Sequence, residues 1–292
     1  MPEIGNKIAE ADINLVDETF ESSHSESYHL YIQTEPGRLS FCVFNTVINQ
    51  YVALRNYPLF ITEHSELVST YNSLFENDDL LGLRYKSSCH LWVSPRCTLV
   101  PDDLFDPNEA DTYLSFTHGS KAGEQTLHHL IRPANLYHVF SCPDTLDTLF
   151  RRYHPQIRHI HHSAPLISSI VTGITLPNKP SVAVFFYSNY LDIVVAQKNK
   201  LLFYNTYQIN APEDSVYYLV GVANILDIDL LSTQLIYAGN FNQMPPEIAI
   251  LKDYVARIIE CNPPNTVTYS HYLQAPVLKN FINLFNLYGC EL

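Results

Sequence analysis

The chain has 292 residues, and 46% of them are hydrophobic, which is enough to form two cores of ordinary size. Its formal net charge is −13, from 30 acidic and 17 basic residues, which disfavours nucleic acid as a partner. No run of about 18 apolar residues occurs, and no basic segment precedes an apolar one at the N-terminus. We therefore expect no membrane insertion and a cytoplasmic location.

The first part of the chain predicts an acidic arm followed by an α/β domain. Residues 1–27 are rich in Ser and acidic side chains and are expected to form a loose arm, with Leu15, Val16 and Phe20 able to pack against the domain. Alternation and helical periodicity then predict strands at 28–34, 39–44 and 50–56, a helix at about 62–76, a strand at 90–94, a helix at 144–153, a strand at 157–161 and a helix at 164–174.

Residues 181–231 carry the clearest pattern in the chain. Strands are predicted at 182–187, 190–196 and 201–209, and a helix follows with Asn210 as its cap, Pro212 in the first turn and Glu213 completing a capping box. The helix body, 216–226, is apolar nearly all round, so we expect it to lie between two layers. A strand at 234–238, a helix at 246–260, a strand at 266–270 and a helix at 275–287 complete this part.

The two parts repeat the same order of elements. Their closing helices match best, since Leu166 and Ile170 precede Val277 and Phe281 by the same interval, and each helix follows an Ala-Pro pair. The spacing of the earlier elements requires an insertion in the first part, at about 95–142. We therefore predict an α/β fold of two tandem RNase H-like (βββαβαβα) domains, 28–176 and 177–292, in an actin-like ATPase arrangement. Two independent α/β domains without a cleft would give the same pattern.

Several segments resemble a known family. They are LVDETF (15–20), YHLYIQ (28–33), LVPDDLF (99–105), NYLDIVVAQKNKLLFYNTYQINAPEDSVYYL (189–219) and GCEL (289–292). With them the chain is similar to the bacterial family known as domain of unknown function 3822, which is described as having an actin-like ATPase fold. The resemblance implies this fold but no activity, and so it supplies no catalytic residues. Through the fold alone there is a remote likeness to actin-like proteins of secretion and pilus assembly.

The turns expected to bind phosphate lack the residues that this chemistry needs. An actin-type ATPase uses an acidic residue and glycines, usually as D-x-G, in the turn between the first two strands of each half. The turns here are TEPGR (34–38) and YSNY (187–190), and Pro36 removes one backbone N–H from the first of them. We therefore expect no catalytic residues and no hydrolysis.

Some residues could still bind a ligand between the halves. Glu35, Gly37 and Arg38 could face the cleft from the first turn, as could Ser188 and Asn189 from the second. Gly239 follows the fourth strand of the second half, where actin-like folds place glycines against adenosine. The same residues are also those that tight turns require. We expect no cofactor, with ATP and Mg²⁺ as the alternative.

Metal chemistry is not predicted. A nuclease of the RNase H type needs converging carboxylates, but neither first strand ends in an acid that fits this role, and Asp192 lies on a second strand. The segment HPQIRHIHHS (154–163) is rich in histidine, but in a strand His159 and His161 share one face while His162 points away. This segment alone could therefore supply at most two histidine ligands to one metal ion. The six cysteines lack C-x-x-C spacing and are expected to be small buried side chains in a reducing compartment: Cys42, Cys89, Cys97, Cys142, Cys261 and Cys290.

Together these patterns favour a non-catalytic binding or scaffold module with a protein partner. The alternative is a nucleotide-binding actin-like ATPase with atypical loops. Neither the partner nor the oligomeric state is encoded in a pattern that can be recognised.

Overall fold

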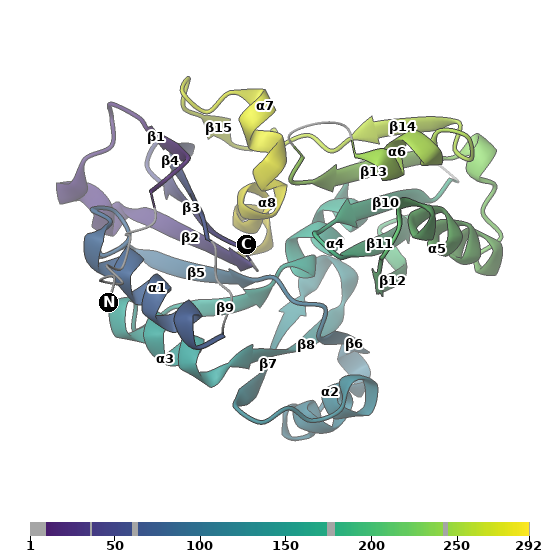
Figure 1. Cartoon of the computed structure of the whole chain (residues 1–292), viewed down its shortest axis with the longest axis horizontal. Coiled ribbons are helices and arrows are strands. Elements are labelled where there is room, and N and C mark those ends of the chain that lie inside the picture. The colour runs from purple at the N-terminus through teal and green to yellow at the C-terminus, as the bar shows by residue number, and fades with distance from the viewer. Residues whose placement is uncertain (1–9, 36, 60–63, 174–178, 242–244, 292) are drawn as a thin grey trace, which may run out of the picture.

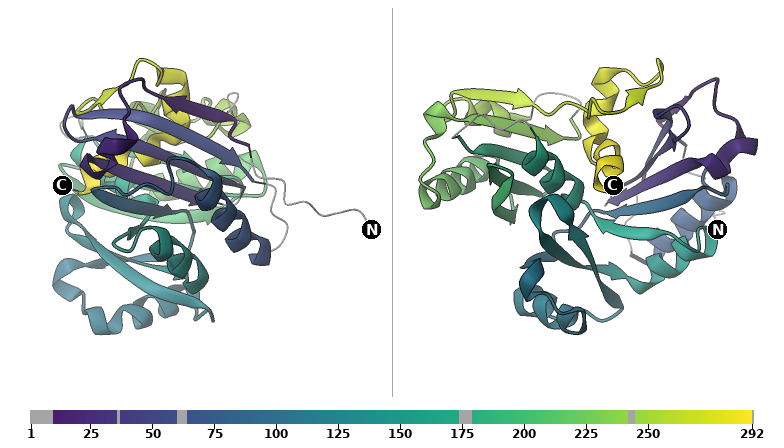
Figure 2. Two further views of the ribbon diagram at one scale, coloured as in Figure 1. Left: turned by 90° about the vertical axis from the view of Figure 1, so that its left-hand side faces the viewer. Right: turned by 180° about the vertical axis from the view of Figure 1, so that it is seen from behind.

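In the computed structural model, residues 10–35, 37–59, 64–173, 179–241 and 245–291 are described. Two large β-sheets lie on either side of a pair of helices, α4 (Ser163–Thr172) and α8 (Ile282–Glu291), and a small third sheet extends from the first (Figures 1 and 2). Within the described ranges, none of the helices has the length and apolar character needed to cross a bilayer.

The first large sheet has the strand order β1-β4-β3-β2-β5-β9, and β15 pairs with β4. Its strands are β1 (Ile13–Val16), β2 (Tyr28–Glu35), β3 (Arg38–Asn45), β4 (Gln50–Pro58), β5 (Ser87–Trp92), β9 (Arg158–His161) and β15 (Thr268–Tyr269). The helices α1 (His64–Asn77) and α3 (Asp144–Tyr153) cover one face. Phe75 of α1 and Phe150 of α3 meet edge to face at 5.3 Å in the core beneath them.

The second large sheet repeats this order, as β12-β11-β10-β13-β14. Its strands are β10 (Ser181–Phe186), β11 (Tyr190–Gln197), β12 (Lys200–Gln208), β13 (Gln234–Gly239) and β14 (Arg257–Glu260), and its outer helices are α5 (Pro212–Ile225) and α6 (Pro246–Leu251). In the first sheet β2, β3 and β4 are antiparallel neighbours, and β5 and β9 run parallel to β2. In the second sheet β10, β11 and β12 are antiparallel neighbours, and β13 and β14 run parallel to β10. The predicted pair of RNase H-like units is therefore confirmed.

The insertion forms its own three-stranded sheet, in the order β6-β8-β7. Its elements are β6 (Cys97–Pro101), α2 (Ala110–His118), β7 (Glu124–Ile131) and β8 (Leu136–Pro143). The remaining short helices are η1 (Ser22–Ser27), η2 (Asp102–Leu104), η3 (Pro107–Glu109), η4 (Arg132–Ala134), η5 (Leu230–Ser232), α7 (Ala275–Leu278) and η6 (Lys279–Phe281).

The two central helices pack on each other and on the opposite halves. Although α4 ends the first unit, it lies on β11 and β12 of the second sheet, whereas α8 ends the second unit and lies on β2 and β3 of the first. One apolar cluster therefore joins both halves. It includes Tyr31 and Phe44 from the first sheet, Val194 from the second, and Ile167 and Phe285 from the two helices.

Two predicted elements after residue 245 are wrong. The helix predicted over 246–260 ends at Leu251, and Arg257–Glu260 instead forms β14, paired in parallel with Gln234–Tyr237. This strand is the fifth of the second sheet. The strand predicted at 266–270 is only Thr268–Tyr269 and pairs with Gln50–Tyr51 of the first sheet. Pairing with a distant strand decided both outcomes, and local periodicity does not contain that information.

Two further local predictions need correction. The helix α5 does not lie between layers, because Tyr217 is 75% exposed and Ile225 is 78% exposed. Its cap is Ala211, and the Asp214 carboxylate accepts the N–H groups of Asn210 and Ala211 at 2.8 and 3.1 Å. In the stretch expected to be a loose arm, β1 pairs with β4.

Candidate functional site

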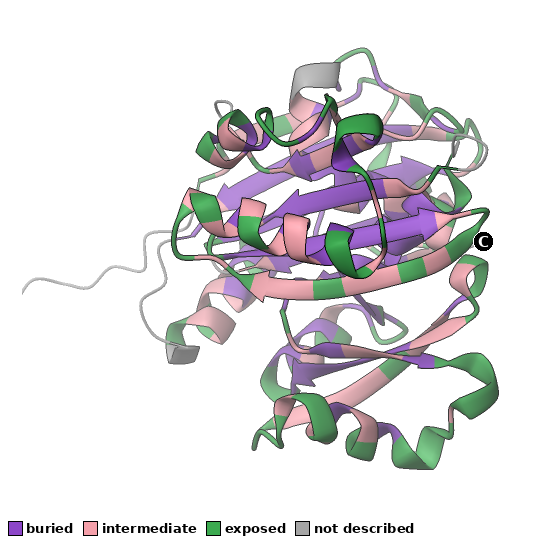
Figure 3. Ribbon diagram, turned by 90° about the vertical axis from the view of Figure 1, so that its right-hand side faces the viewer, coloured by how far each residue is buried: buried purple, intermediate pink, exposed green. Residues whose placement is uncertain are grey.

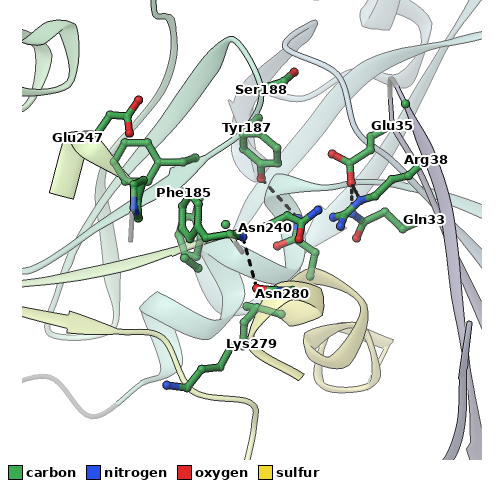
Figure 4. Close-up of a pocket in the computed structure, with 18 of the residues that line it drawn as sticks. Gln33, Glu35, Arg38, Phe185, Tyr187, Ser188, Asn240, Glu247, Lys279 and Asn280 are labelled. Carbon is green, nitrogen blue, oxygen red and sulfur yellow. Dashed lines mark hydrogen bonds and ion pairs between the residues drawn. The ribbon is translucent and has the colours of Figure 1, made fainter. Parts of the chain in front are cut away.

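The main candidate site is a pocket of about 590 Å³ between the two halves, called the cleft pocket below (Figure 4). The turn between β2 and β3 forms one wall, and the ends of β10 and β13 form the other. Residues at the start of α6, in η6 and at the start of α8 close it. Five of the six predicted binding residues line this pocket: Glu35, Gly37, Arg38, Ser188 and Gly239.

The sixth predicted residue, Asn189, does not line the pocket. It is exposed in the turn between β10 and β11, and its carbonyl accepts the N–H of Ile209 at 2.9 Å. The residue therefore serves the hairpin, as the turn interpretation of its sequence allows.

The first wall carries a closed ion pair. Glu35 and Arg38 are opposite each other in the β2–β3 register, and Arg38 Nε donates to Glu35 Oε1. Gln33 Nε2 donates to the same carboxylate oxygen at 3.0 Å. Gly37 has φ = 90°, which permits the tight two-residue turn that brings the pair together. Pro36 lies outside the described residues. The carboxylate at the end of the first strand is thus occupied by protein donors.

Two buried polar atoms of this wall have no hydrogen-bond partner among the described residues. They are Oε1 of Gln33, whose residue is 2% exposed, and Nη1 of Arg38, whose residue is 9% exposed. Both side chains line the cleft pocket, and the Arg38 guanidinium also lies 5.3 Å from the ring centre of Phe281. A buried unsatisfied donor or acceptor costs about 1–3 kcal/mol. A ligand that supplied one acceptor and one donor here would recover that cost.

The second wall is a closed hairpin turn. The backbone N–H of Tyr187 donates to the carbonyl of Tyr190 at 2.9 Å, and the two rings stack at 4.6 Å. The Tyr187 hydroxyl is 3.4 Å from Asn283 Nδ2 on α8. Burial, together with the nearby Asp192 carboxylate, raises the pKa of Tyr187 well above its usual value. Because its backbone N–H is bonded to the Tyr190 carbonyl, Tyr187 has no free N–H to bind a phosphate.

Gly239 is covered by an aromatic ring. A Cβ atom at this position would lie 2.4 Å from Cζ of Phe241 and 2.9 Å from the carbonyl oxygen of Phe186. The glycine thus permits close packing of a side chain of this same chain. The place where actin-like folds hold adenosine is next to the Phe241 ring.

The charges of the pocket do not fit a magnesium triphosphate. Among the described residues that line it, the two cations are already paired, Arg38 with Glu35 and Lys279 with Glu260. Glu247 adds a further negative charge. Phosphoryl transfer depends on cations and free N–H groups around the phosphates. A triphosphate would therefore have to compete with Glu35 for Arg38 and with Glu260 for Lys279.

Comparison with known proteins agrees with this fold. The family described as "Protein of unknown function (DUF3822)" matches residues 17–258. The chain belongs to this family. No curated protein matches the sequence.

Solved structures are similar in fold. A protein from Bacteroides thetaiotaomicron VPI-5482, with an actin-like ATPase fold and unknown function, is 20% identical over 85% of this chain and 95% of its own, with a TM-score of 0.77. The PilM–PilN type IV pilus biogenesis complex is 11% identical over 90% of this chain and 99% of its own, with a TM-score of 0.55. At these identities the likeness establishes the actin-like fold alone.

Sequence reasoning missed much of the pocket. Two further lining residues are Asn280 in η6 and Asn283 in the first turn of α8, and two polar residues three apart in an apolar stretch are a signal that the sequence contains. Gln33 is a polar residue inside an apolar strand, which was a second signal. Phe241 could not be found in this way, because its role depends on the close approach of Gly239.

The acid weighed for nuclease chemistry has a different role. Asp192 is fully buried and accepts a hydrogen bond from Thr206 Oγ1 at 2.6 Å. Its other oxygen lies 2.9 Å from Nε2 of His162. The Tyr204 hydroxyl also lies 3.4 Å from Oδ1, so the carboxylate is held by protein groups between the second sheet and α4.

Proposed function

We propose that this protein is a non-catalytic binding or scaffold module, and that its cleft pocket holds an extended segment of a protein partner. The observation that carries the proposal is the pair of buried, unpartnered atoms, Gln33 Oε1 and Arg38 Nη1. A peptide group offers an N–H for the first and a carbonyl for the second. A cytoplasmic location, as expected from the sequence, is part of the same proposal.

Other features of the pocket suit a peptide better than a nucleotide. Its volume of about 590 Å³ is within the usual range for ligand sites. Aromatic side chains from the second half, including Tyr187 and Phe241, line it together with paired charges. The PilM–PilN structure, with its TM-score of 0.55, is a complex of two proteins, which supports a protein partner for this fold.

The rival function is that of an actin-like ATPase with atypical loops. Isothermal titration of the full chain with ATP and Mg²⁺ separates the two. We expect no binding tighter than about 100 µM and no phosphate release. Tighter binding would contradict the proposal, because it would mean that the closed turns open to accept a triphosphate.

Peptide binding in the pocket is tested by crosslinking in the host cell. A photoreactive amino acid replaces Ser188, which is exposed and lines the pocket, or Phe116, which is 91% exposed on helix α2 of the insertion and serves as the control. We expect a discrete adduct from position 188 only. Gln33→Met, which keeps the side-chain length but removes the acceptor, should abolish it. Equal adducts from both positions, or none from position 188, would contradict a peptide in the pocket.

A further inference from the structure

The structure brings together histidine and cysteine side chains that are far apart in the sequence. Among the described residues, two groups of three buried side chains each place one nitrogen or sulfur atom within 4.8 Å of the others. One group is His90, Cys142 and His159. The other is Cys97, His138 and His161. The two groups differ in how well hydrogen bonds within the protein account for them.

Hydrogen bonds account for the first group. The Nδ1 atoms of His90 and His159 are 2.8 Å apart, and Nε2 of His90 is 2.6 Å from the Thr34 hydroxyl. Nε2 of His159 lies 2.8 Å from Asp147 Oδ1, within ion-pair distance although not aligned as a hydrogen bond. Two nitrogens that bind one tetrahedral zinc ion are separated by about 3.3 Å. The shorter spacing here is that of a shared proton.

The second group lies where three sheets meet. Cys97 begins β6 and His138 is on β8, and the register places both on one face of the inserted sheet. His161 ends β9 of the first sheet, and its ring lies 4.4 Å from that of His138. All three residues are buried, with Cys97 the most exposed at 8%. Buried thiol and imidazole groups from separate elements form a typical donor set for zinc.

His161 is held as a metal ligand would be. Its Nε2 is 2.6 Å from the carbonyl oxygen of Ser94, so Nε2 carries the proton and Nδ1 carries a lone pair. Nδ1 lies 3.0 Å from the Ser163 hydroxyl and accepts the backbone N–H of the same residue at 3.3 Å, a long contact that a metal ion would replace. A histidine that binds a metal usually donates its other N–H to a carbonyl or carboxylate in this way.

The other imidazoles of this region are incompletely satisfied. Within the part of the chain that the structure describes, Nδ1 of His138 is buried without a hydrogen-bond partner, and so are both ring nitrogens of His129, which is opposite His138 in the β7–β8 pair. Nε2 of His138 is 3.2 Å from the Ser163 hydroxyl, which therefore lies between the two ligand histidines. The hydroxyl oxygen is thus within about 3.2 Å of a ring nitrogen of each histidine, a spacing that suits a fourth ligand of a tetrahedral ion.

The surroundings also suit a cation. The Asp192 carboxylate is fully buried, and its described partners are neutral hydroxyls and His162. The Tyr204 hydroxyl connects it to the group, at 3.4 Å from Asp192 Oδ1 and 3.6 Å from Cys97 Sγ. One thiolate and one carboxylate together balance a divalent ion.

We propose that Cys97, His138 and His161 bind one divalent transition-metal ion of the zinc class, with Ser163 beside the fourth position. The ion fixes the inserted sheet to the junction of the two halves. This site is separate from the cleft pocket and does not depend on its function.

The test measures metal in the full chain. Protein refolded from urea with Zn²⁺ and then dialysed should contain one zinc ion per chain. Refolding with Co²⁺ should give the absorption band of a cobalt–thiolate bond. Cys97→Ser should remove this band and lower the zinc content about tenfold. Cys142→Ser, at the buried cysteine of the first group, is the matched control and should change neither.

Each other outcome overturns the proposal. Wild-type protein that refolds but contains no zinc, or that gives no thiolate band with Co²⁺, has no such site. Loss of zinc from Cys142→Ser to the same extent as from Cys97→Ser would show that binding is not at this group. The wild-type cobalt spectrum decides the question even if Cys97→Ser fails to fold.

Discussion

The two halves have the same strand order but differ at the edge of the third strand. In the first sheet, β4 is bordered by β1 and β15, which come from opposite ends of the described chain. In the second, β12 is an edge strand that alternates between exposed and half-buried residues (Figure 3). The first half is thus completed by distant segments and the second is not, so topology alone does not determine how far a sheet edge is covered.

The largest loss of stability should come from removing the Phe285 ring, which α8 packs against the first sheet. Phe285 is fully buried, 4.8 Å from Tyr51 and 5.4 Å from Tyr269. Phe285→Ala should lower the free energy of unfolding by about 3–5 kcal/mol in urea titrations. Leu231→Ala, at a residue 70% exposed in the second half, is the control and should change it by less than about 0.5 kcal/mol. Similar losses of unfolding free energy from Phe285→Ala and Leu231→Ala would contradict the view that α8 completes the first half.

A smaller effect is expected at the one close backbone approach in the second half. Gly239→Ala places a Cβ against Phe241 and the Phe186 carbonyl and should destabilise the protein by about 1–3 kcal/mol. Gly221→Ala, in α5 with open space around it, should stabilise the protein by about 0.5–1 kcal/mol. Thermal unfolding should show a lower melting temperature for Gly239→Ala and a higher one for Gly221→Ala. A change in the same direction for both would contradict tight packing against Phe241.

Acid should affect the first half before the second, because residues 177–292 contain one histidine, His271. Burial lowers the pKa of His90 well below its usual value, and His159 adds to this. Burial also lowers the pKa of His154, although a hydrogen bond to Leu81 opposes it. These rings are neutral when folded but bind protons when unfolded. Their contribution is therefore complete above pH about 6.5 and is lost as the pH falls below it.

From pH 7.5 to 5.5 the unfolding free energy, measured in urea, should fall, because these and the other buried histidines of the first half take up protons on unfolding. His154→Gln keeps an N–H donor for the Leu81 carbonyl and should make this fall smaller. His271→Gln, at an exposed residue, is the control and should recover nothing. Hydrogen exchange at pH 5.5 should be faster in the first half. Uniform acceleration across both halves would contradict this reading.

The smallest effect concerns the bond that joins the two segments flanking β4. Ser270 Oγ, next to β15, donates to Asp17 Oδ2, next to β1. Burial raises the pKa of Asp17, but the hydrogen bonds from Ser270 and Thr19 outweigh it, so the pKa is lowered overall. Ser270→Ala should cost about 1 kcal/mol at pH 7, whereas Ser120→Ala, in an exposed loop, should cost nothing measurable. If Ser270→Ala left the unfolding free energy unchanged, backbone pairing alone would hold β1 and β15 at this edge.

The sequence predicted the fold wherever one short stretch contains its own explanation. Strands such as 182–187 and 190–196 are long apolar runs next to turn residues, and four of the five predicted residues that line the pocket lie in such turns. The pairing of β15 with the first sheet could not be predicted in this way, because no local pattern specifies a distant partner strand. That the two halves arose by internal duplication stays a prediction.

The inserted sheet shows the same limit for chemistry. Histidines within 154–163 were weighed only with one another, although His161 meets Cys97 and His138 from other strands. Donors that converge across a fold leave no local spacing to recognise. The missing information was the position of the insertion relative to β9.

The exchange of α4 and α8 between the sheets has a consequence for biosynthesis. While the chain is being made, the face of the first sheet around Tyr31 and Phe44 has no covering until the residues of α8 appear. The first sheet is thus completed by a helix that is synthesised after all five strands of the second sheet. During that interval the nascent chain exposes an apolar aromatic surface, to which chaperones that recognise such surfaces would bind.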